Sequence, residues 1–356
     1  MRALLIVNPR ATSTTRLRRD VIASALASAV KLEVVETRYR GHASALAASA
    51  RDEGFGLVLT LGGDGTVNEA VNGMLSVTQP ETAGGPEATG GPETTGGPET
   101  TGGPETTGGP ETADGIETPG PPARRPSAAE LPALAPIPGG SGNVFAGALG
   151  LPRDPIDATG HILRALEEGR ERTIGLGDAD GRYFTFNSGL GLDAEVVRAV
   201  QGLRAHGRQA STSLYLRLAL RQFYSQTDRS HPAIQIEAQD GRSEGPVFLV
   251  IVSNAAPWTY LGQREVNANP QARFDRGLDV FTLRNMSSFS TLYALSQMLT
   301  TKGGELHGRR ILTMHDQPSL TLRADRPVAF QIDGEYVGER ELVRLSSVPE
   351  ALRVVA

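Results

Sequence analysis

Apolar residues in the first 75 positions follow two alternating patterns. Strand-like runs occur at 3–7, 32–36 and 57–61, and the first is a continuous apolar run typical of a strand buried on both faces of a sheet. Segments with helical spacing of apolar or alanine residues lie at 14–29, 42–53 and 67–75. Strands and helices that alternate in this way predict a parallel, Rossmann-like α/β sheet.

The pattern changes from about residue 172 onward. Short alternating runs predict strands at 182–187, 232–238, 246–253, 278–284, 320–324 and 328–332. Asp-Gly pairs that begin at 180, 240 and 333 are typical of tight hairpin turns. Two helices are expected near 212–224 and 286–301. This half of the chain is therefore predicted to be a mostly antiparallel, β-rich domain.

A repetitive segment, 79–130, interrupts the first domain. The tetrapeptide Gly-Gly-Pro-Glu begins at 84, 90, 96, 102 and 108, and no leucine, isoleucine or valine lies between 84 and 115. Such a composition predicts a disordered polar insertion, because it has little apolar surface to bury. A short strand at 134–137 is expected to follow, near a sheet edge because proline cannot donate to the ladder.

Three units follow from this organisation. Residues 1–150 are expected to form the α/β domain, and 151–340 the β-rich domain. Residues 341–356 are expected to return to the first domain.

Deletion of residues 82–128 is expected to leave the melting temperature and activity nearly unchanged. Loop-closure entropy changes by only about 2 kcal/mol between a short loop and one of this length. A thermal unfolding scan of the shortened chain tests this, and a collapse of the melting temperature would show that the repeat is structural.

Composition removes several classes of function. The formal net charge is −5, which does not support a strongly basic nucleic-acid-binding protein. Cysteine is absent, which excludes disulfides, cysteine-ligated metals and cysteine nucleophiles. Neither Lys31 nor Lys302 lies in a P-loop pattern. The apolar run at 3–7 is too short for a signal peptide or a membrane span, so a cytoplasmic protein is expected.

The most informative motif is Gly62-Gly63-Asp64-Gly65-Thr66, at the end of the third predicted strand. Glycines let backbone N–H groups approach phosphate oxygens, and the start of the following helix favours an anion. Asp64 beside phosphates is a plausible partner of Mg²⁺ or of its water. Thr66 and Glu69 fit a helix capping box. A capped strand–turn–helix corner without a ligand remains the alternative.

Three further segments carry polar chemistry. Pro138-Gly-Gly-Ser-Gly-Asn143 is a second glycine-rich turn, whose Ser141 and Asn143 suit phosphate binding or helix capping. Asn8-Pro9-Arg10-Ala11-Thr12 is a polar loop after the first strand. Asp333-Gly334-Glu335 is either a plain hairpin turn or a carboxylate pair that accepts a proton from a hydroxyl nucleophile.

Together these segments resemble the diacylglycerol kinase catalytic-domain family, the bacterial lipid kinases that are also similar to sphingosine and ceramide kinases. The resemblance covers nearly the whole chain except 79–130. NAD kinases and phosphofructokinases share a shorter form of the glycine-rich loop, so the combination is more specific than that loop alone. It consists of Asn8-Pro9, Thr37 with Gly41-His42-Ala43, Gly62–Glu69, Pro138–Asn143, Asn187–Asp193 and Asp333-Gly334-Glu335.

The resemblance implies an ATP-dependent transfer of the γ-phosphate to a lipid hydroxyl, with diacylglycerol as the expected acceptor and Mg²⁺ as cofactor. Asp64 would help to hold Mg²⁺ through phosphates or water, and Asp333 or Glu335 would accept the proton, with a slight preference for Glu335. The residues implied to bind the nucleotide are Asn8, Pro9, Arg10, Ala11, Thr12, Thr37, Gly62, Gly63, Asp64, Gly65, Thr66, Val67, Asn68, Glu69 and Ser141.

The sequence also departs from the family pattern. Ser141 replaces the usual threonine and keeps a hydroxyl, whereas Val144 replaces an aspartate and loses a carboxylate. Asp275 to Asp279 is similar to an acidic turn that binds a structural Mg²⁺ in some members, which makes these two aspartates candidate ligands. Arg276 stands there in place of an acidic residue.

Two other functions fit parts of the sequence. An NAD kinase-like enzyme for a soluble substrate explains Gly62–Thr66, and a non-catalytic lipid-binding protein of the same fold explains Val144. For a lipid kinase without an anchor, transient membrane contact and a peripheral location are expected. Tyr215, Arg217, Leu218 and Arg221 on the predicted 212–224 helix are candidates for that contact, although a helix that covers the sheet is the simpler role. A homodimer is compatible with the sequence.

Overall fold

A computed structural model describes residues 1–12, 15–76, 125–205, 230–301 and 304–356, with only the backbone described at 203–205. Most of the predicted insertion and the whole predicted 212–224 helix, including Tyr215, Arg217, Leu218 and Arg221, lie outside the described residues. Met1–Ser76 and Pro126–Ala356 form one compact unit. Within the described residues, no helix is both long and apolar enough to span a bilayer.

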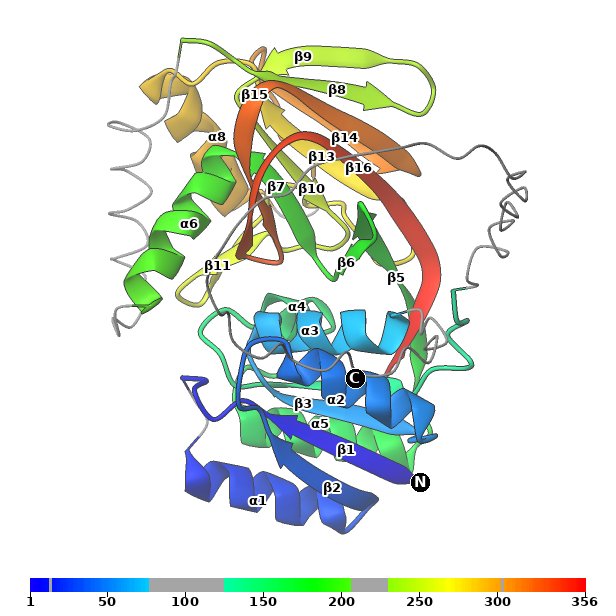
Figure 1. Ribbon diagram of the computed structural model, residues 1–356. Helices are drawn as coiled ribbons and strands as arrows, with labels where there is room; N and C mark the ends of the chain where they lie inside the picture. Colours follow the sequence, from blue (N-terminus) through cyan, green and yellow to red (C-terminus); the bar gives the residue numbers. More distant parts are fainter. Residues whose placement is uncertain (13–14, 77–124, 206–229, 302–303) are drawn as a thin grey trace, which may run out of the picture. The chain divides into compact units, whose positions relative to one another are not determined.

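The first lobe is built on four parallel strands in the order β2–β1–β3–β4 (Figure 1). The strands are β1 (Arg2–Val7), β2 (Lys31–Glu36), β3 (Leu57–Gly62) and β4 (Ala133–Pro138). The helices are α1 (Arg16–Ala27), α2 (His42–Asp52), α3 (Asp64–Leu75), α4 (Val144–Ala148) and α5 (Pro155–Glu167). This arrangement confirms the predicted parallel α/β sheet.

The register of the four strands aligns their carboxyl ends. Val7 pairs with both Glu36 and Leu61, and Leu61 pairs with Ile137. The loops after β1, β2, β3 and β4 therefore begin side by side at one edge of the sheet. In open α/β sheets this edge is where ligands bind.

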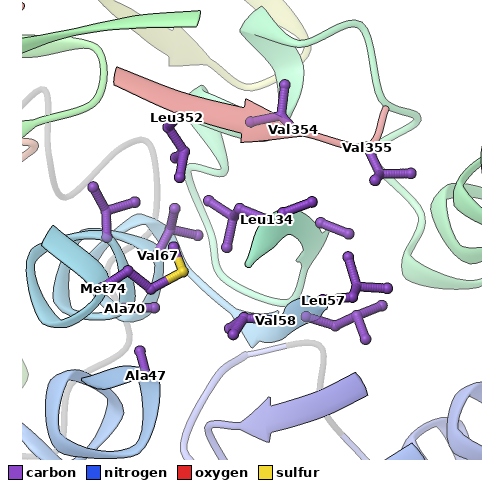
Figure 2. Packing of buried hydrophobic residues seen from close by; sticks show 14 of the residues in the cluster. Ala47, Leu57, Val58, Val67, Ala70, Met74, Leu134, Leu352, Val354 and Val355 are labelled. Carbon is purple, nitrogen blue, oxygen red and sulfur yellow. The ribbon is translucent and has the colours of Figure 1, made fainter. Parts of the chain in front are cut away.

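Helix α3 is fixed by the core and by α2. Val67, Ala70 and Met74 are buried, and they lie near Leu134 of β4 and Ala47 of α2 (Figure 2). On another side of the helix, Gly73 approaches the Ser44 carbonyl of α2 so closely that a Cβ would have no room. The helix that begins at the glycine-rich motif therefore has a defined position.

The second lobe is mostly antiparallel, as predicted. Its helices are α6 (Leu192–Ala205) and α8 (Ser288–Thr300), the latter matching the predicted 286–301 helix. Its strands are β5 (Arg172–Ala179), β6 (Arg182–Phe184), β7 (Asn187–Gly191), β8 (Ile234–Ala238), β9 (Ser243–Val247), β10 (Leu249–Ser253), β11 (Thr259–Leu261), β12 (Arg264–Val266), β13 (Leu278–Leu283), β14 (Ile311–Gln317), β15 (Ser319–Ile332) and β16 (Glu335–Val354).

Strand β16 links the two lobes into one sheet. It pairs with β15 over its first half, with β5 further along, and with β4 at Val354 and Leu134 (Figure 1). The prediction that β4 lies near a sheet edge is therefore wrong, because β3 pairs with one side of β4 and β16 with the other. Only Leu134 of β4 pairs with β16, however, and Pro136 and Pro138 lie beyond that pair, so their missing N–H groups break no ladder.

Two of the three Asp-Gly pairs form tight turns as predicted, whereas Asp240-Gly241 lies in the longer β8–β9 connection, where only Gly241 has a positive φ, of 84°. Asp180 and Asp333 have φ angles of 49° and 46°, and the glycines that follow them have φ angles of 86° and 74°. Positive φ at both central residues is the geometry that a two-residue hairpin needs. The two runs predicted at 320–324 and 328–332 belong to one strand, β15, because the register shift between Arg323 and Val328 bends the strand without ending it.

Candidate active site

The glycine-rich motif turns directly into α3. Gly63 is the N-cap residue with extended backbone, and the helix begins at Asp64, three residues before the predicted start. The predicted capping box is wrong, because Thr66 already lies inside the helix. The Thr66 hydroxyl instead accepts a hydrogen bond from Asn8 Nδ2 at 3.1 Å. The sequence pattern misplaced the start because threonine is as good an N-cap residue as glycine, and the actual cap is Gly63.

Glu69 caps a different helix. Its carboxylate accepts hydrogen bonds from the backbone N–H groups of Gly41 at 2.9 Å and Ala43 at 3.3 Å, at the start of α2. A carboxylate there satisfies unpaired helix donors and complements the helix dipole. The bond to Gly41 also fixes the loop that leaves β2.

The loops after β3 and β4 touch through their glycines. The Gly139 N–H donates to the Gly62 carbonyl at 2.7 Å, and a Cβ on Gly140 would lie 2.6 Å from the Gly63 Cα. Asn143 closes the second loop, since its side chain accepts from the Gly140 N–H and donates to the Gly140 carbonyl, each at 2.8 Å. The two glycine-rich turns thus form one continuous backbone surface suited to phosphate oxygens.

The loop after β1 is held by Asn8. Its Oδ1 accepts from the Arg10 N–H at 3.0 Å while its amide binds Thr66, and its own N–H donates to the Leu61 carbonyl at 2.9 Å. Pro9, Arg10 and Thr12 are exposed at this edge. Asn8 therefore shapes the loop, and the residues after it are the ones available to a ligand.

Asp64 stands between two helix starts. It is the first residue of α3, and its Oδ1 accepts a hydrogen bond from the Phe145 N–H of α4 at 3.1 Å. Burial raises the pKa of Asp64 to about 6, an effect that hydrogen bonds from backbone N–H groups at the start of α4 oppose. The buried carboxylate of Asp333 raises the pKa further by repulsion. A nearby cation would therefore stabilise the ionised form of Asp64.

This pKa predicts a pH dependence. Asp64 is ionised above about pH 6 and protonated below it, so kcat/KM should fall as the pH is lowered from 7 to 5, with an apparent midpoint near 6 in the free protein. Initial rates at subsaturating substrate, with circular dichroism to show that the fold persists, measure this. A flat profile across pH 5–7 would contradict an ionised Asp64.

Asp333 is buried and fully engaged. It accepts hydrogen bonds from Thr185 N–H at 2.7 Å, Thr185 Oγ1 at 2.9 Å, Phe186 N–H at 3.0 Å, Asn187 N–H at 3.1 Å and Asn68 Nδ2 at 2.8 Å. Burial raises the pKa of Asp333, and the donors from the backbone lower it. With five donors on its two oxygens, Asp333 anchors the β15–β16 turn to β7 and α3.

Glu335 is the more accessible carboxylate of the pair. Its side chain is 22% exposed, and its Oε2 lies 3.2 Å from both Arg40 Nη2 and Arg182 Nη2. Its Oε1 occupies the space that a side chain at position 65 would fill, because a Cβ on Gly65 would lie 2.7 Å from it. Gly65 is therefore needed so that Glu335 can rest against the first turn of α3.

The structure thus brings together the predicted catalytic carboxylates. Gly65, which contacts Glu335, directly follows Asp64, and Asn68 in the next turn of α3 binds Asp333. The carboxylates from residues far apart in the sequence converge on the start of α3, where the four loops of the first lobe also begin.

Three residues of the implied nucleotide set face the protein instead. Val67 lies in the hydrophobic core, Asn68 joins Asp333 and the Tyr183 carbonyl, and Glu69 caps α2. These side chains position α3, because their partners belong to the chain itself. The residues of this loop that stay accessible to a ligand are Gly63, Asp64 and Gly65.

The remaining implied residues lie at the same sheet edge. The Thr37 N–H donates to the Val7 carbonyl at 2.8 Å, which places Thr37 at the end of β2 next to the β1 loop. Ser141 is exposed on the loop after β4. Val144 is buried at the start of α4, so the position where the resemblance expects an aspartate contributes to the core.

Comparison with known proteins agrees with this geometry. Residues 2–178 match the model of the diacylglycerol kinase catalytic domain, and residues 188–356 match that of the YegS C-terminal NAD kinase beta sandwich-like domain. The chain belongs to the diacylglycerol kinase catalytic-domain family. The resemblance inferred from the motifs is confirmed, and the chain is a member of a lipid kinase family.

Individual relatives extend over the whole chain. Two proteins named probable lipid kinase YegS-like are similar. One, from Stenotrophomonas maltophilia, is 26% identical, and the match covers 98% of this chain and 94% of the relative. The other, from Chromohalobacter salexigens, is 23% identical, with 99% and 92% covered. A crystal structure of a diacylglycerol kinase from Bacillus anthracis has the same fold, with a TM-score of 0.64 at 17% identity, covering 99% of this chain and 96% of that one.

The two candidate metal ligands of the 275–279 turn, Asp275 and Asp279, have different binding partners. Asp275 forms a two-pronged ion pair with Arg273, with distances of 2.9 and 2.8 Å, and lines a cavity of about 490 Å³. Asp279 is buried and accepts from the Asp316 N–H at 2.9 Å, with His315 Nδ1 at 3.0 Å. Among the described residues, no three metal-ligating side chains converge, here or elsewhere. A structural metal at this turn remains a prediction.

Several residues of the site belong to no motif that the sequence shows. Arg40 and Arg182 join Glu335 only because the β2–α2 loop and the β5–β6 turn meet at α3. Gln331 links the turn to α6, since it donates to Asp193 at 2.7 Å and accepts from the Gly334 N–H at 2.9 Å. Burial raises the pKa of Asp193 to about 6.

Proposed function

We propose that the protein transfers the γ-phosphate of ATP to the hydroxyl of a membrane lipid, with diacylglycerol as the acceptor and phosphatidic acid as the product. The observation that carries this proposal is the convergence of Asp64 and Glu335 at the start of α3, where glycine-rich turns supply backbone donors. Family membership gives the reaction class, and the names of the relatives favour a lipid acceptor.

The triphosphate would lie along the edge where the four parallel strands end. Backbone N–H groups of the touching loops at Gly62–Gly65 and Gly139–Gly142 suit phosphate oxygens, and the start of α3 favours their negative charge. Residues 9–12, Thr37 and Ser141 lie at the same edge and would contact the rest of the nucleotide. Loops that meet without side chains leave room for phosphates at backbone distance.

Mg²⁺ fits this site as a partner of the phosphates. Asp64 is a single carboxylate whose pKa is raised by burial and by the nearby carboxylate of Asp333. One carboxylate suits an ion held mainly by phosphate oxygens and water. When bound, the ion neutralises phosphate charge, and the role of Asp64 is to hold it by direct contact or through water.

Glu335 would accept the proton of the lipid hydroxyl. The hydroxyl oxygen attacks the γ-phosphorus, the bond from that phosphorus to the bridging oxygen of ADP breaks, and the hydroxyl proton passes to the Glu335 carboxylate. Arg40 and Arg182 hold this carboxylate through Oε2, which leaves Oε1 toward Gly65 and the phosphate edge. Asp333 would position the turn, because all of its oxygen contacts are already made within the protein.

Incubation of the purified protein with γ-labelled ATP, Mg²⁺ and a panel of lipids tests the function. The panel contains dihexanoylglycerol, a ceramide and a sphingoid base, and NAD is supplied in a parallel reaction. Label should appear in organic-extractable phosphatidic acid. Label in NADP would replace the proposal by a nucleotide kinase, and no label in any acceptor would favour a non-catalytic lipid-binding protein.

A further inference from the structure

Helix α8 exposes an apolar face. Phe289, Leu292 and Tyr293 are 81%, 59% and 48% exposed, although large apolar side chains are usually buried. The helix is attached through a different face, on which Ser290, Ala294 and Met298 are buried (the third of these near β12).

The composition of α8 is equally unusual for a surface helix. Its thirteen residues, Ser288–Thr300, include no charged side chain. Surface helices in water normally carry charges on the outer face, so an exposed stripe of phenylalanine, leucine and tyrosine indicates a less polar neighbour. Helices that lie in a membrane interface have this pattern, with aromatic and leucine side chains inserted at the headgroup boundary.

Arginines border this stripe. Arg310 Nη1 donates to Ser290 Oγ at 2.9 Å and Ser287 Oγ at 3.2 Å, at the start of α8. A Cβ on Gly308 would lie 3.5 Å from Tyr293 Cε1, which places the exposed Arg309 beside the stripe. Neither arginine forms an ion pair with a carboxylate among the described residues. Positive charge therefore adjoins the apolar face, which complements anionic lipid headgroups.

We propose that the outer face of α8 is a membrane-docking surface, with Phe289, Leu292 and Tyr293 entering an anionic phospholipid bilayer and Arg309 and Arg310 contacting its headgroups. This proposal rests on the lipid kinase function proposed above, because that function brings the protein to a membrane.

The docking helix is connected to the candidate active site through the β11–β12 hairpin. The Asn267 N–H after β12 donates to the Met298 carbonyl of α8 at 2.9 Å. On the other strand of the hairpin, the Tyr260 hydroxyl packs directly against Gly147 of α4, the helix whose start binds Asp64. A helix held by the bilayer would thus be coupled by direct contacts to the phosphate edge.

Sedimentation with vesicles tests the surface. The vesicles are phosphatidylcholine with or without phosphatidylglycerol, and the variants are the double substitution Phe289→Glu with Leu292→Glu, and Arg309→Glu. Leu17→Glu on α1 is the matched control, because Leu17 is 76% exposed on a different element. The double variant should bind phosphatidylglycerol vesicles at least about tenfold more weakly than the wild type, from the loss of two inserted apolar side chains. Arg309→Glu should weaken binding to these vesicles only, and Leu17→Glu should bind like the wild type.

Two further readouts separate this proposal from the proposed function. With dihexanoylglycerol in free solution, the double variant should retain wild-type turnover, whereas the KM for vesicle-embedded diacylglycerol should rise about tenfold. If no lipid is phosphorylated, the proposed function fails while the sedimentation result still decides the docking surface.

Three results would overturn the docking surface. These are equal vesicle binding by the double variant and the wild type, a wild type that does not sediment with vesicles, or light scattering that shows a wild-type dimer converted to a monomer by the double variant. The last result would mean that a second copy of this chain covers the face. A lower melting temperature of the double variant without wild-type vesicle binding would mean that another segment of the chain covers it.

Discussion

Replacement of Asp64 by asparagine is expected to reduce phosphoryl transfer at least about a hundredfold and, at the same time, to stabilise the protein. Asparagine keeps the oxygen that accepts from Phe145 and removes the charge, so the loops keep their geometry while the partner of Mg²⁺ is lost. Radiolabel transfer at equal concentrations of folded protein measures the first effect. Activity above a tenth of the wild-type rate would remove Asp64 from the mechanism.

The stabilising effect follows from the pKa. Burial raises the pKa of Asp64 from 3.8 to about 6, so the folded state binds this proton more tightly than the unfolded state does. Between these values stability falls as the pH rises, and above pH 6 the ionised carboxylate costs up to about 3 kcal/mol. Asp64→Asn should therefore raise the free energy of unfolding by about 1–3 kcal/mol at pH 8, and by much less at pH 4.

Urea unfolding at both pH values, without nucleotide or metal, measures this difference. Asp157→Asn is the matched control, because Asp157 is an exposed aspartate in the first turn of α5. It should leave activity unchanged and alter stability by no more than about 1 kcal/mol. A destabilised Asp64→Asn at pH 8 would show that the ionised carboxylate is held by stronger contacts than those at the start of α4.

Asp333 and Glu335 are expected to respond to substitution in opposite ways. In Asp333→Asn, the new NH2 group would face N–H groups that donate to a carboxylate oxygen in the wild type. This substitution should lower the free energy of unfolding by about 3–5 kcal/mol. For a chain of this size that is a fall in melting temperature of about 5–8 °C. Glu335→Gln removes a part-exposed carboxylate and should change stability by no more than about 1 kcal/mol.

Activity should separate the two residues in the other direction. Glu335→Gln should lower kcat at least about a hundredfold in a protein that melts like the wild type, because the proton acceptor is lost. Glu339→Gln is its control, since Glu339 lies on the same strand and pairs with Arg198 at 3.1 Å. If Glu335→Gln stays active while a fully folded Asp333→Asn is inactive, the proton acceptor is Asp333.

The sequence predicted the parts of the fold that depend on local pattern. The apolar runs of β1 and β3 and the Asp-Gly turn at Asp333 appear where expected, because burial and positive φ leave a direct mark on residue choice. The proximity of Glu335 to Asp64 was implied by the family resemblance, because Glu335 begins β16 on a hairpin of the second lobe and is not at the end of a parallel strand.

Other parts of the site depend on contacts that no local pattern records. Glu69 looked like half of a capping box for its own helix, yet its partners belong to α2. Arg40 and Arg182 meet at Glu335 only through the packing of the two lobes. The start of α3 was misplaced because the glycines at 62, 63 and 65 give no clear cap signal.

The start of α3, between Asp64 and Glu335, is proposed to receive the terminal phosphate of ATP. A crystal structure of the complex with Mg²⁺ and a non-hydrolysable ATP analogue tests it most directly. We expect the triphosphate to lie along Gly62–Gly65 and Gly139–Gly142, with its terminal phosphate beside both carboxylates. A nucleotide bound elsewhere, for example in the cavity lined by Phe274 and Glu350, would contradict it.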